Sequence, residues 1–351
     1  MKKIAIFQKD LDIGGIQRSL LNFVTNMDLS AYEVDLFLFK EPTICTIDDL
    51  KGINVTVLKP LFYLNRVVKF DILLKTCNFE LPDKEYDLAI DFNSYSNECA
   101  LCAVKVNAKK RVMWIHNDLI IEYKENRKYR ILFSAFKGKY KYFDEFVAVS
   151  RGIVAPFRKQ TGIGNDVRIR VIPNTINTQM LFKKASEPVD FTVDQSKVNF
   201  VFVGRFTKQK GIDLLLDYFA EALSYRADIH LYLLGDGSER IAVEQQIASL
   251  KIGENVTLVG SVENPYPYMD KMDALVLTSR HEGQGMVLWE AKALGLDIIF
   301  SKNLEKYNDS LVGNRDIAKS IVLEQKHTKS RNMLDRYNLK IKNSLYELFD
   351  R

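Results

Sequence analysis

Short apolar runs alternate with amphipathic stretches along the chain, and a first set occupies its N-terminal half. Strands are predicted at 3–7, 34–39, 55–58, 88–92, 111–116 and 145–149. A helix is predicted from about 16 to 26, directly after the glycine pair Gly14-Gly15. Strands that alternate with helical segments are typical of a parallel sheet with crossover helices.

A second set begins after the polar segment 186–197, which contains a proline, lacks an amphipathic period and is interpreted as a linker. Strands are predicted at 198–204, 229–235, 255–260, 273–279 and 297–301, with helices at about 211–225, 238–250 and 285–295. The tail adds one more helix. At about 150 residues per domain, this pattern predicts an α/β fold of two doubly wound, Rossmann-like domains facing across a cleft.

Hydropathy and cysteine content narrow the class of protein. No apolar run approaches the roughly 18 residues of a membrane span. The opening MKKIAIF starts like a signal peptide, but polar residues from Gln8 onward end its apolar run, so we expect a first strand. The few scattered cysteines fit a cytoplasmic protein, and the CxxC pair Cys99 and Cys102 is expected to be buried thiols rather than a zinc or redox site.

The segment VFVGRFTKQKG, residues 201–211, places two cations between a strand and a helix. Gly204 ends the predicted strand, Arg205 follows it, and Lys210 precedes the helix. Ligands of doubly wound sheets bind outside the carboxyl ends of the strands, so this pair suits a diphosphate. A solvated charged turn explains the segment equally well when it is taken alone.

The segment SRHEGQGMVLWEAKALG, residues 279–295, carries two glutamates around a glycine pair. Glu290 lies in an apolar helical run, with no basic residue three or four positions away. Its carboxylate therefore needs a partner from another element or from a ligand, and the two hydroxyls of a ribose match its two acceptor oxygens. A distant arginine or backbone amides are the alternatives. Glu282 precedes Gly283 and Gly285, which let backbone N–H groups approach a small ligand.

The segment DIGGIQRSL, residues 12–20, opens the first helix but has neither the GxGxxG nor the Walker spacing. A tight turn that needs glycine is favoured over a cradle for an anion or a sugar. Asp10 and Asp12 form an Asp-x-Asp, which we interpret as a polar loop rather than a metal site.

Together, and in this order, GGIQR, GRFTKQKG, LGDGSER and SRHEGQGMVLWEAKALG resemble the retaining glycosyltransferases of the GT-B fold, most closely family 4, also called group 1. The resemblance covers essentially the whole chain and is strongest from about 198 to 300. VAVSRGI (147–153) and VIPNTIN (171–177) are similar to the end of that family's first domain. The resemblance implies an acceptor-binding domain at 1–176, with a helix at about 333–351 packing back on it, and a donor-binding domain at 177–332.

The resemblance also implies roles for individual residues. Arg205 and Lys210 would bind the donor diphosphate, Glu290 the ribose, and Glu282 the transferred sugar. His116, in WIHND, matches a histidine that contacts the donor sugar, although a lone histidine is equally well a structural residue. The implied catalytic residues are Glu282, His116, Arg205 and Lys210, and the donor site adds Gly15, Gly204, Gly283, Gln284, Gly285, Met286 and Glu290.

Family membership would imply transfer of a hexose or N-acetylhexosamine from a nucleotide diphosphate sugar, with a UDP-sugar favoured, and with retention of configuration. The acceptor would be a glycan or a lipid-linked saccharide in cell-envelope or capsular polysaccharide biosynthesis. No cofactor and no metal are expected, because two cations and helix N-termini can stabilise the leaving diphosphate. The sequence departs from the family's pattern at two places, so the identity of the donor sugar stays open. Asp297 stands where relatives usually have a proline. SKNLEKYNDS stands where they often have a glycine-containing loop that leads to an acidic residue, and Glu305 matches that residue only loosely.

A basic region stands out in the first domain. Residues 101–175 carry 16 basic and six acidic side chains, a net charge of +10. Within them, 121–143 interleaves cations with aromatic residues, which suits a surface helix docking on anionic lipid at the inner face of the cell membrane. The alternative is a solvated helix face whose aromatic side chains pack inward. Nucleic-acid binding uses similar residues, but nothing else in the sequence resembles a nucleic-acid-binding module. The docking cations would be Lys124, Arg127, Lys128, Arg130, Lys137, Lys139 and Lys141.

Two other functions stay open at this stage. A non-catalytic GT-B subunit that stabilises or recruits a transferase would tend to lose the phosphate-binding cations or the glutamate pair, and this chain keeps both. A nicotinamide dehydrogenase is disfavoured, because no GxGxxG follows either first strand.

Overall fold

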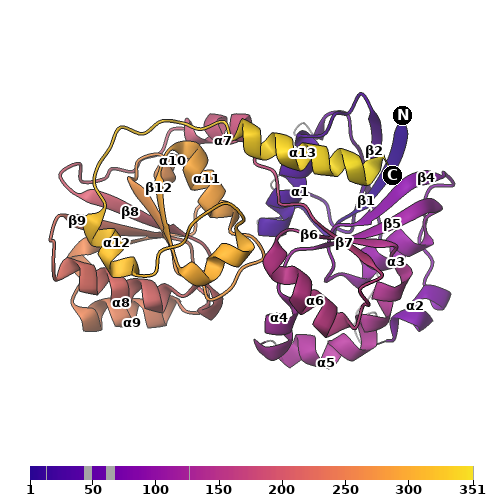
Figure 1. The fold of residues 1–351 in the computed structure, drawn as a ribbon, viewed down its shortest axis with the longest axis horizontal. Helices are drawn as coiled ribbons and strands as arrows, with labels where there is room; N and C mark the ends of the chain where they lie inside the picture. Colours follow the sequence, from indigo (N-terminus) through magenta and orange to yellow (C-terminus); the bar gives the residue numbers. More distant parts are fainter. Residues whose placement is uncertain (13, 43–49, 61–67, 126, 351) are drawn as a thin grey trace. The chain divides into compact units, whose positions relative to one another are not determined.

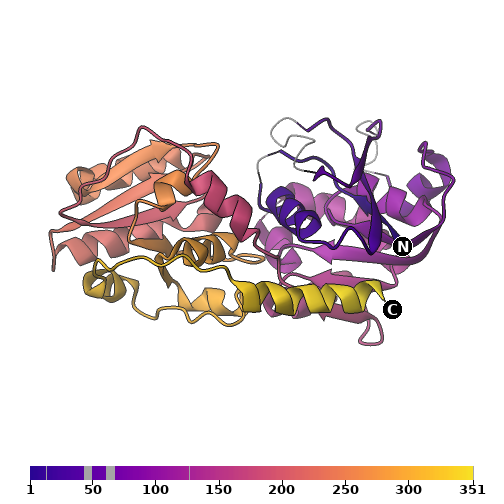
Figure 2. The same ribbon diagram turned by 90° about the horizontal axis from the view of Figure 1, so that it is seen from above.

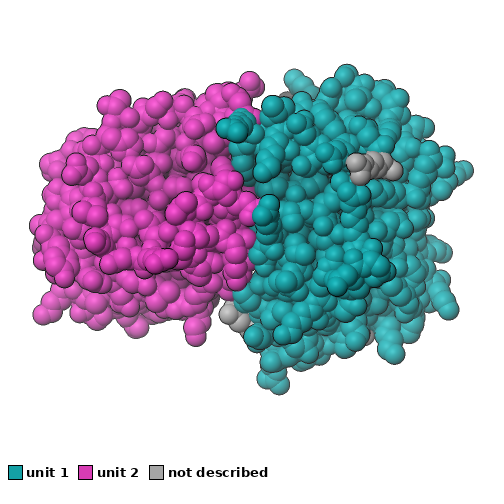
Figure 3. All heavy atoms as spheres, viewed as in Figure 1, with its two compact units in different colours: residues 1–175, 336–351 teal, residues 176–335 magenta. Residues whose placement is uncertain are grey.

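The structure is a computed structural model that describes residues 1–12, 14–42, 50–60, 68–125 and 127–350. It divides into two compact units, Met1–Thr175 with Arg336–Arg351, and Ile176–Asp335 (Figure 3). This division lies one residue before the predicted boundary at 176/177. The polar segment 186–197 contains neither helix nor strand, but it lies inside the second unit, so interpreting it as the linker between domains was wrong.

The sheet of the first unit is parallel, with the strand order β3-β2-β1-β4-β5-β6-β7 among the described residues (Figure 1). Sequence patterns located every one of these strands except β7, whose RIRV sequence is exposed or half-buried and forms no apolar run. The strands are β1 (Lys2–Phe7), β2 (Tyr32–Leu38), β3 (Asn54–Val57), β4 (Tyr86–Asp91), β5 (Ala108–Ile115), β6 (Glu145–Ala148) and β7 (Arg168–Val171).

Helices cover both faces of this sheet. The helix α13 (Asp335–Phe349) lies on the same face as α1 (Gly15–Thr25), while the remaining helices lie on the other (Figures 1 and 2). The ring of Phe349 packs 6.1 Å from that of Phe23 and 5.2 Å from that of Tyr32, and its carbonyl accepts a hydrogen bond from Lys2. The other helices are α2 (Phe70–Thr76), α3 (Asn97–Lys105), α4 (Leu119–Glu125), α5 (Arg127–Phe136) and α6 (Val154–Thr161).

The second unit has a smaller parallel sheet, in the order β10-β9-β8-β11-β12. Its strands are β8 (Val198–Val203), β9 (Ile229–Leu234), β10 (Val256–Gly260), β11 (Ala274–Leu277) and β12 (Asp297–Phe300). One face carries α8 (Ile212–Leu223), α9 (Arg240–Leu250) and α12 (Ile317–Leu323), and the other α7 (Thr178–Ala185), α10 (Tyr266–Met269) and α11 (Met286–Leu294) (Figure 1). The predicted α/β class, with two doubly wound domains, is confirmed.

The order of the strands reverses between β1 and β4 in the first unit, and between β8 and β11 in the second. Ligands of open α/β sheets bind at such switch points, outside the carboxyl ends of the strands. Arg205 follows β8, and the loop 279–285 follows β11. The topology therefore brings both predicted motifs of the second unit to one switch point.

Candidate functional site

The loops that follow β8 and β11 are joined by hydrogen bonds and by a close backbone approach. Gly211 has φ +62°, and a Cβ there would lie 2.3 Å from the carbonyl oxygen of Thr278, so this close approach requires glycine. The Thr278 hydroxyl donates to the Gly211 carbonyl at 2.8 Å. The backbone N–H of Arg280 donates to Gln209 at 2.8 Å, and the Gln209 amide donates to the carbonyl of His281 at 3.1 Å. Two motifs some 70 residues apart thus form one surface.

A salt bridge that sequence analysis missed reinforces this junction. Both terminal nitrogens of Arg280 donate to the carboxylate of Asp213, at 2.8 and 2.6 Å, and one also donates to the carbonyl of Lys208 at 2.9 Å. These hydrogen bonds hold the pKa of Asp213 below its usual value. No short-range pattern marks a pair so far apart in sequence.

Lys210 and Glu282, both assigned to the donor, pair with each other. The ammonium of Lys210 donates to Glu282 Oε1 at 2.7 Å, and the two side chains are only 19% and 9% exposed. Arg205 is different, because it is exposed and its guanidinium has no hydrogen bond or ion pair among the described residues. An incoming anion would therefore meet Arg205 as an unneutralised cation, as it would the exposed Lys208 in the same loop.

Glu290 lies on α11 and is 2% exposed, as the apolar run around it predicted. Its Oε1 accepts a hydrogen bond from the hydroxyl of Tyr266, on α10, at 3.0 Å. At least one partner thus comes from another element, as predicted, and it is the phenol of Tyr266. The neighbouring Trp289 is buried, as expected for a core residue.

The glycine loop before α11 is held by a buried asparagine. Asn308 accepts from the backbone N–H of Gly285 at 3.0 Å and donates to the carbonyl of Leu304 at 3.1 Å. A sugar oxygen that used the Gly285 N–H would have to replace Asn308. Met286 begins α11, whose N-terminus presents partial positive charge to the loop Gly283–Gly285. Glu305, the loose candidate in the same region, accepts from Lys302 and from the backbone of Gly313.

The two remaining glycines of the predicted donor site have different surroundings. A Cβ on Gly204 would lie 3.3 Å from the ring of Phe202, a tight approach, and 3.6 Å from Lys210 Cε, an ordinary van der Waals contact. Beside Gly15 nothing lies within 4 Å of such a Cβ. Gly14 has an extended φ of 176°, and Gly15 has no positive φ, so the preferred interpretation of this pair as a tight turn that needs glycine was wrong.

His116 follows β5 in the first unit and is buried. Its Nε2 donates to the carbonyl of Phe92 at 3.0 Å, and its ring packs 4.9 Å from the ring of Phe92. Burial lowers the pKa of His116 to about 4, so the imidazole is neutral at pH 7. These contacts are those of a structural histidine, and its predicted contact with the donor sugar stays a prediction.

The basic region folds as α4, α5 and a 3-10 helix, Lys137–Tyr142, rather than as one helix. The aromatic residues of α5, Tyr129, Phe133 and Phe136, are buried, whereas Ile131 is 61% exposed. Lys141 pairs with Asp71 at 2.9 Å, and the side chain of Lys128 lies outside the described part of the structure. None of the described helices is both long and apolar enough to cross a bilayer. The exposed cations are Lys124, Arg127, Arg130, Lys137 and Lys141.

Lys139 was wrongly assigned to this surface. Its side chain is wholly buried, donates to the carbonyl of Ser94 at 2.5 Å and is coupled electrostatically to the buried Asp91. Burial lowers the pKa of Lys139 to about 8 and raises that of Asp91 to about 7. Lys139 is therefore a buried cation that interacts electrostatically with Asp91, and it is inaccessible to lipid.

Two other features identified in the sequence lie apart from these motifs. Cys99 and Cys102 are buried thiols, as predicted, and burial raises the pKa of both. Asp10 accepts from Gln17 at 2.6 Å, and Asp12 pairs with Lys40 at 2.5 Å.

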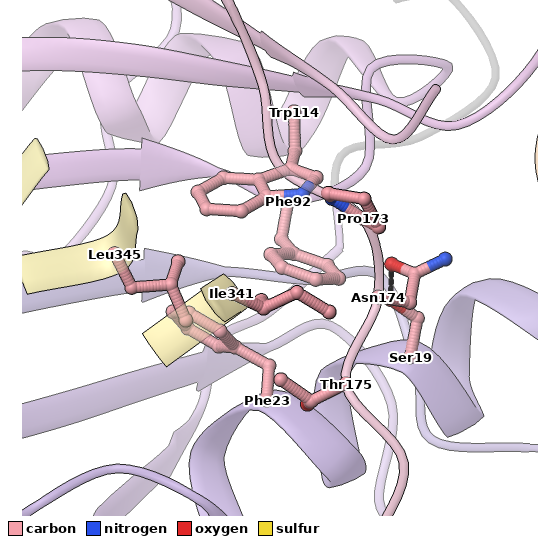
Figure 4. Close-up of a pocket in the computed structure, with 9 residues that line it drawn as sticks. All are labelled: Ser19, Phe23, Phe92, Trp114, Pro173, Asn174, Thr175, Ile341 and Leu345. Carbon is pink, nitrogen blue, oxygen red and sulfur yellow. Dashed lines mark hydrogen bonds between the residues drawn. The ribbon is translucent and has the colours of Figure 1, made fainter. Parts of the chain in front are cut away.

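A small cavity lies inside the first unit, between α1, α13 and residues 173–175 (Figure 4). Its volume is about 10 Å³, which is room for about one water molecule. Ser19 donates to Asn174 at its edge, and apolar side chains such as Phe92 and Leu345 line it. This cavity is too small for a sugar.

Two family profiles match the chain, one for each unit. The profile "Glycosyltransferase Family 4" matches residues 13–180, and "Glycosyl transferases group 1" matches residues 197–322. Among curated proteins, the uncharacterized glycosyltransferase MJ1059 of Methanocaldococcus jannaschii is 26% identical over 246 residues, which are 66% of this chain and 59% of that protein. The lipopolysaccharide core biosynthesis glycosyltransferase LpsE of Rhizobium meliloti is 29% identical over 38% of each chain. These matches span between 38% and 59% of the relatives' lengths.

Solved structures agree on the fold. HepE of Anabaena, solved in complex with UDP and glucose, superposes with a TM-score of 0.70 at 17% identity and covers 100% of both chains. WaaG, a glycosyltransferase involved in lipopolysaccharide biosynthesis, superposes with a TM-score of 0.57 at 13% identity, over 99% of this chain and 90% of that one. Because the two profiles cover most of both units and the fold is that of these enzymes, the chain belongs to glycosyltransferase family 4, the group 1 proteins of the GT-B fold.

Proposed function

We propose that this protein is a retaining hexosyltransferase. It transfers a hexose or N-acetylhexosamine from a nucleotide diphosphate sugar, most simply a UDP-sugar, to a glycan or lipid-linked acceptor in cell-envelope or capsular polysaccharide biosynthesis. The observation that carries the proposal is the exposed, unneutralised Arg205 at the β8/β11 switch point. The names of LpsE and WaaG support the pathway, and the complex of HepE with UDP and glucose supports the donor class.

Donor binding would begin with the diphosphate. The guanidinium of Arg205 can donate two parallel hydrogen bonds to a phosphate, and the N-terminus of α11 favours the same negative charge. Lys210 now pairs with Glu282 and would exchange that carboxylate for a phosphate oxygen. The exchange would leave Glu282 able to accept hydrogen bonds from the hydroxyls of the sugar.

The chemical step needs no side-chain nucleophile. The acceptor hydroxyl oxygen bonds to the anomeric carbon on the face from which the diphosphate leaves. The bond between that carbon and the diphosphate oxygen breaks, its electron pair stays on the diphosphate, and the acceptor proton passes to a leaving phosphate oxygen. Arg205 and Lys210 would stabilise the charge that develops there, without a metal ion or cofactor.

A lipid-linked acceptor would place the enzyme at the cytoplasmic face of the membrane. The exposed cations of α4, α5 and the 3-10 helix support contact with anionic headgroups, and Ile131 adds an exposed apolar side chain between them. Lys139 has no part in this surface.

Calorimetric titration with UDP, GDP and CDP, each with and without magnesium, tests the proposal. We expect one nucleotide to bind without metal, Arg205→Ala to abolish that binding, and the exposed control Lys271→Ala to leave it unchanged. A screen of the corresponding nucleotide sugars would then identify the donor. Folded protein that binds none of the three nucleotides would instead favour a non-catalytic subunit that stabilises or recruits a transferase.

A further inference from the structure

The buried carboxylate of Glu290 is oriented by a second buried side chain. Tyr266 donates its hydroxyl to Glu290 Oε1 at 3.0 Å, and it is 7% exposed while Glu290 is 2% exposed. A glutamate side chain has three rotatable bonds, and a hydrogen bond to one carboxylate oxygen limits the directions in which both oxygens can point. A hydrogen bond to an ionised acceptor in a buried position is among the stronger ones in proteins.

Tyr266 is itself anchored to another helix of the same unit. Its backbone N–H donates to Asn264 Oδ1 at 3.1 Å. The amide of Asn264 donates to the carbonyl of Lys184, at the end of α7, at 2.8 Å and to the carboxylate of Glu187 at 2.7 Å. A chain of hydrogen bonds thus runs from the end of α7 through Asn264 and Tyr266 to Glu290.

We propose that Tyr266 is a positioning residue that holds the Glu290 carboxylate in the orientation needed to accept both hydroxyls of a ribose. This inference rests on the proposed function, in which Glu290 binds the ribose of the donor. A bidentate contact, in which each carboxylate oxygen accepts one of two adjacent hydroxyls, requires both oxygens to face the sugar at once, whereas a single hydrogen bond does not. Tyr266 acts through Glu290 and needs no contact of its own with the nucleotide.

Tyr266→Phe removes the donor and keeps the ring in the core. We expect it to weaken binding of the preferred nucleoside diphosphate by about tenfold, the effect of losing a hydrogen bond to a charged group. The matched control is Tyr268→Phe, two positions along on α10, whose side chain is half-buried and whose hydroxyl has no hydrogen bond among the described residues. This control should bind like the wild type.

Ribose analogues separate positioning from a general structural role. The probes are whichever of UDP, GDP and CDP binds best, its 2′,3′-dideoxy analogue, and inorganic diphosphate, measured by calorimetry. In the wild type, removal of the two hydroxyls should weaken binding. In Tyr266→Phe and in Glu290→Gln that penalty should largely disappear, with binding of inorganic diphosphate unchanged. Equal weakening of all three probes in Tyr266→Phe would mean that the site has deformed, and would overturn the positioning role.

The outcomes also distinguish failure of this inference from failure of the proposed transferase function on which it rests. If the wild type binds none of the nucleotides, the proposed function fails, and the inference fails with it. If the wild type and Glu290→Gln show the same ribose dependence, Glu290 does not bind the ribose and Tyr266 has nothing to position. If Glu290→Gln loses the ribose dependence but Tyr266→Phe keeps it, the transferase assignment stands and the role of Tyr266 is overturned.

Discussion

The ammonium of Lys210 lies 2.7 Å from Glu282 Oε1, and this ion pair connects the loops that follow β8 and β11. Removing Lys210 leaves the buried Glu282 carboxylate unpaired, and removing Glu282 leaves the half-buried Lys210 ammonium unpaired. We therefore expect Lys210→Met and Glu282→Gln each to destabilise the second unit, by about 3 kcal/mol at most, while the double variant recovers most of the loss. Urea unfolding of the single and double variants measures this.

Activity should respond differently from stability. Because both residues are proposed to serve the donor, the double variant should be folded but inactive. A double variant with wild-type turnover would remove Lys210 and Glu282 from the catalytic machinery.

The pH dependence of the first unit should report on His116. Its pKa is about 4 in the fold and 6.5 when unfolded, so its contribution to stability is complete above pH 6.5 and is lost as the pH falls towards 4. His116→Gln keeps a donor for the Phe92 carbonyl but does not titrate. We expect the wild type to lose about 3 kcal/mol more unfolding free energy than this variant between pH 7 and pH 4.

This measurement needs a fluorescent probe that reports on the first unit alone, and a tryptophan of that unit provides it. The two tryptophans of the chain, Trp114 and Trp289, lie in different units. Trp289→Phe leaves the fluorescence of Trp114 to report on the first unit alone. Parallel pH curves for the wild type and His116→Gln in that background would contradict the prediction.

Lys139 and Lys137 are two residues apart, but their replacement should have very different effects on the stability of the first unit. Lys139→Met leaves the buried Asp91 without its cation, so it should destabilise the first unit by about 3 kcal/mol. Lys137 is exposed, and Lys137→Met should change stability by less than about 0.5 kcal/mol. Denaturation followed through Trp114 distinguishes them; equal effects would show that burial of Lys139 does not matter.

The membrane proposal makes a prediction about vesicles. Each exposed cation near an anionic surface contributes about 1 kcal/mol, so replacing four of them should weaken binding to phosphatidylglycerol vesicles at least a hundredfold. Binding to neutral phosphatidylcholine vesicles should be weak for the wild type and for the variant with four replacements. Added salt should weaken binding of the wild type to the anionic vesicles. Co-sedimentation that does not differ between the wild type and the variant would reject this surface as the docking site. The replaced residues are Lys124, Arg127, Arg130 and Lys137.

Gly211 tests the junction of the two loops. Its φ of +62° and the 2.3 Å approach to the Thr278 carbonyl mean that Gly211→Ala should destabilise the second unit by about 2 kcal/mol or more. Gly253→Ala is the matched control, because a Cβ there meets nothing closer than 3.9 Å. Equal thermal stability of the two variants would show that the loops after β8 and β11 can move apart at Gly211 without loss of stability.

The sequence predicted the architecture well because parallel strands are buried on both faces and appear as short apolar runs. The strands of the second unit were predicted to within two residues of their observed ends. β7 was missed because two arginines interrupt its apolar pattern, whereas the more exposed β3 keeps two valines that mark a strand. The family segments near 171–177 gave a boundary one residue from the division into compact units, whereas the polar segment 186–197 lies inside the second unit.

At the candidate site, the sequence motifs predicted which residues lie at the switch point, but they did not predict the hydrogen-bond and ion-pair partners of those residues. Asp213 and Arg280, Tyr266 and Glu290, and Gly285 and Asn308 are joined across separate elements, and no periodicity links such partners. Lys139 shows the opposite error. Lysines at every second position of a basic segment look like one exposed surface, but in the 3-10 helix Lys137–Tyr142 the middle one turns inward.

The helix α13 has a consequence for how the chain is made. It belongs to the first unit, but residues 176–335 are synthesised between it and the rest of that unit. At roughly 5–20 residues per second, that interval lasts about 10–30 s. During it, Phe23 and Tyr32 lack the ring of Phe349 that packs against them, while the second unit, a single uninterrupted segment, can already fold. The first unit is thus begun before the second and completed after it, and its unfinished core is a part of the nascent protein that chaperones would be expected to meet.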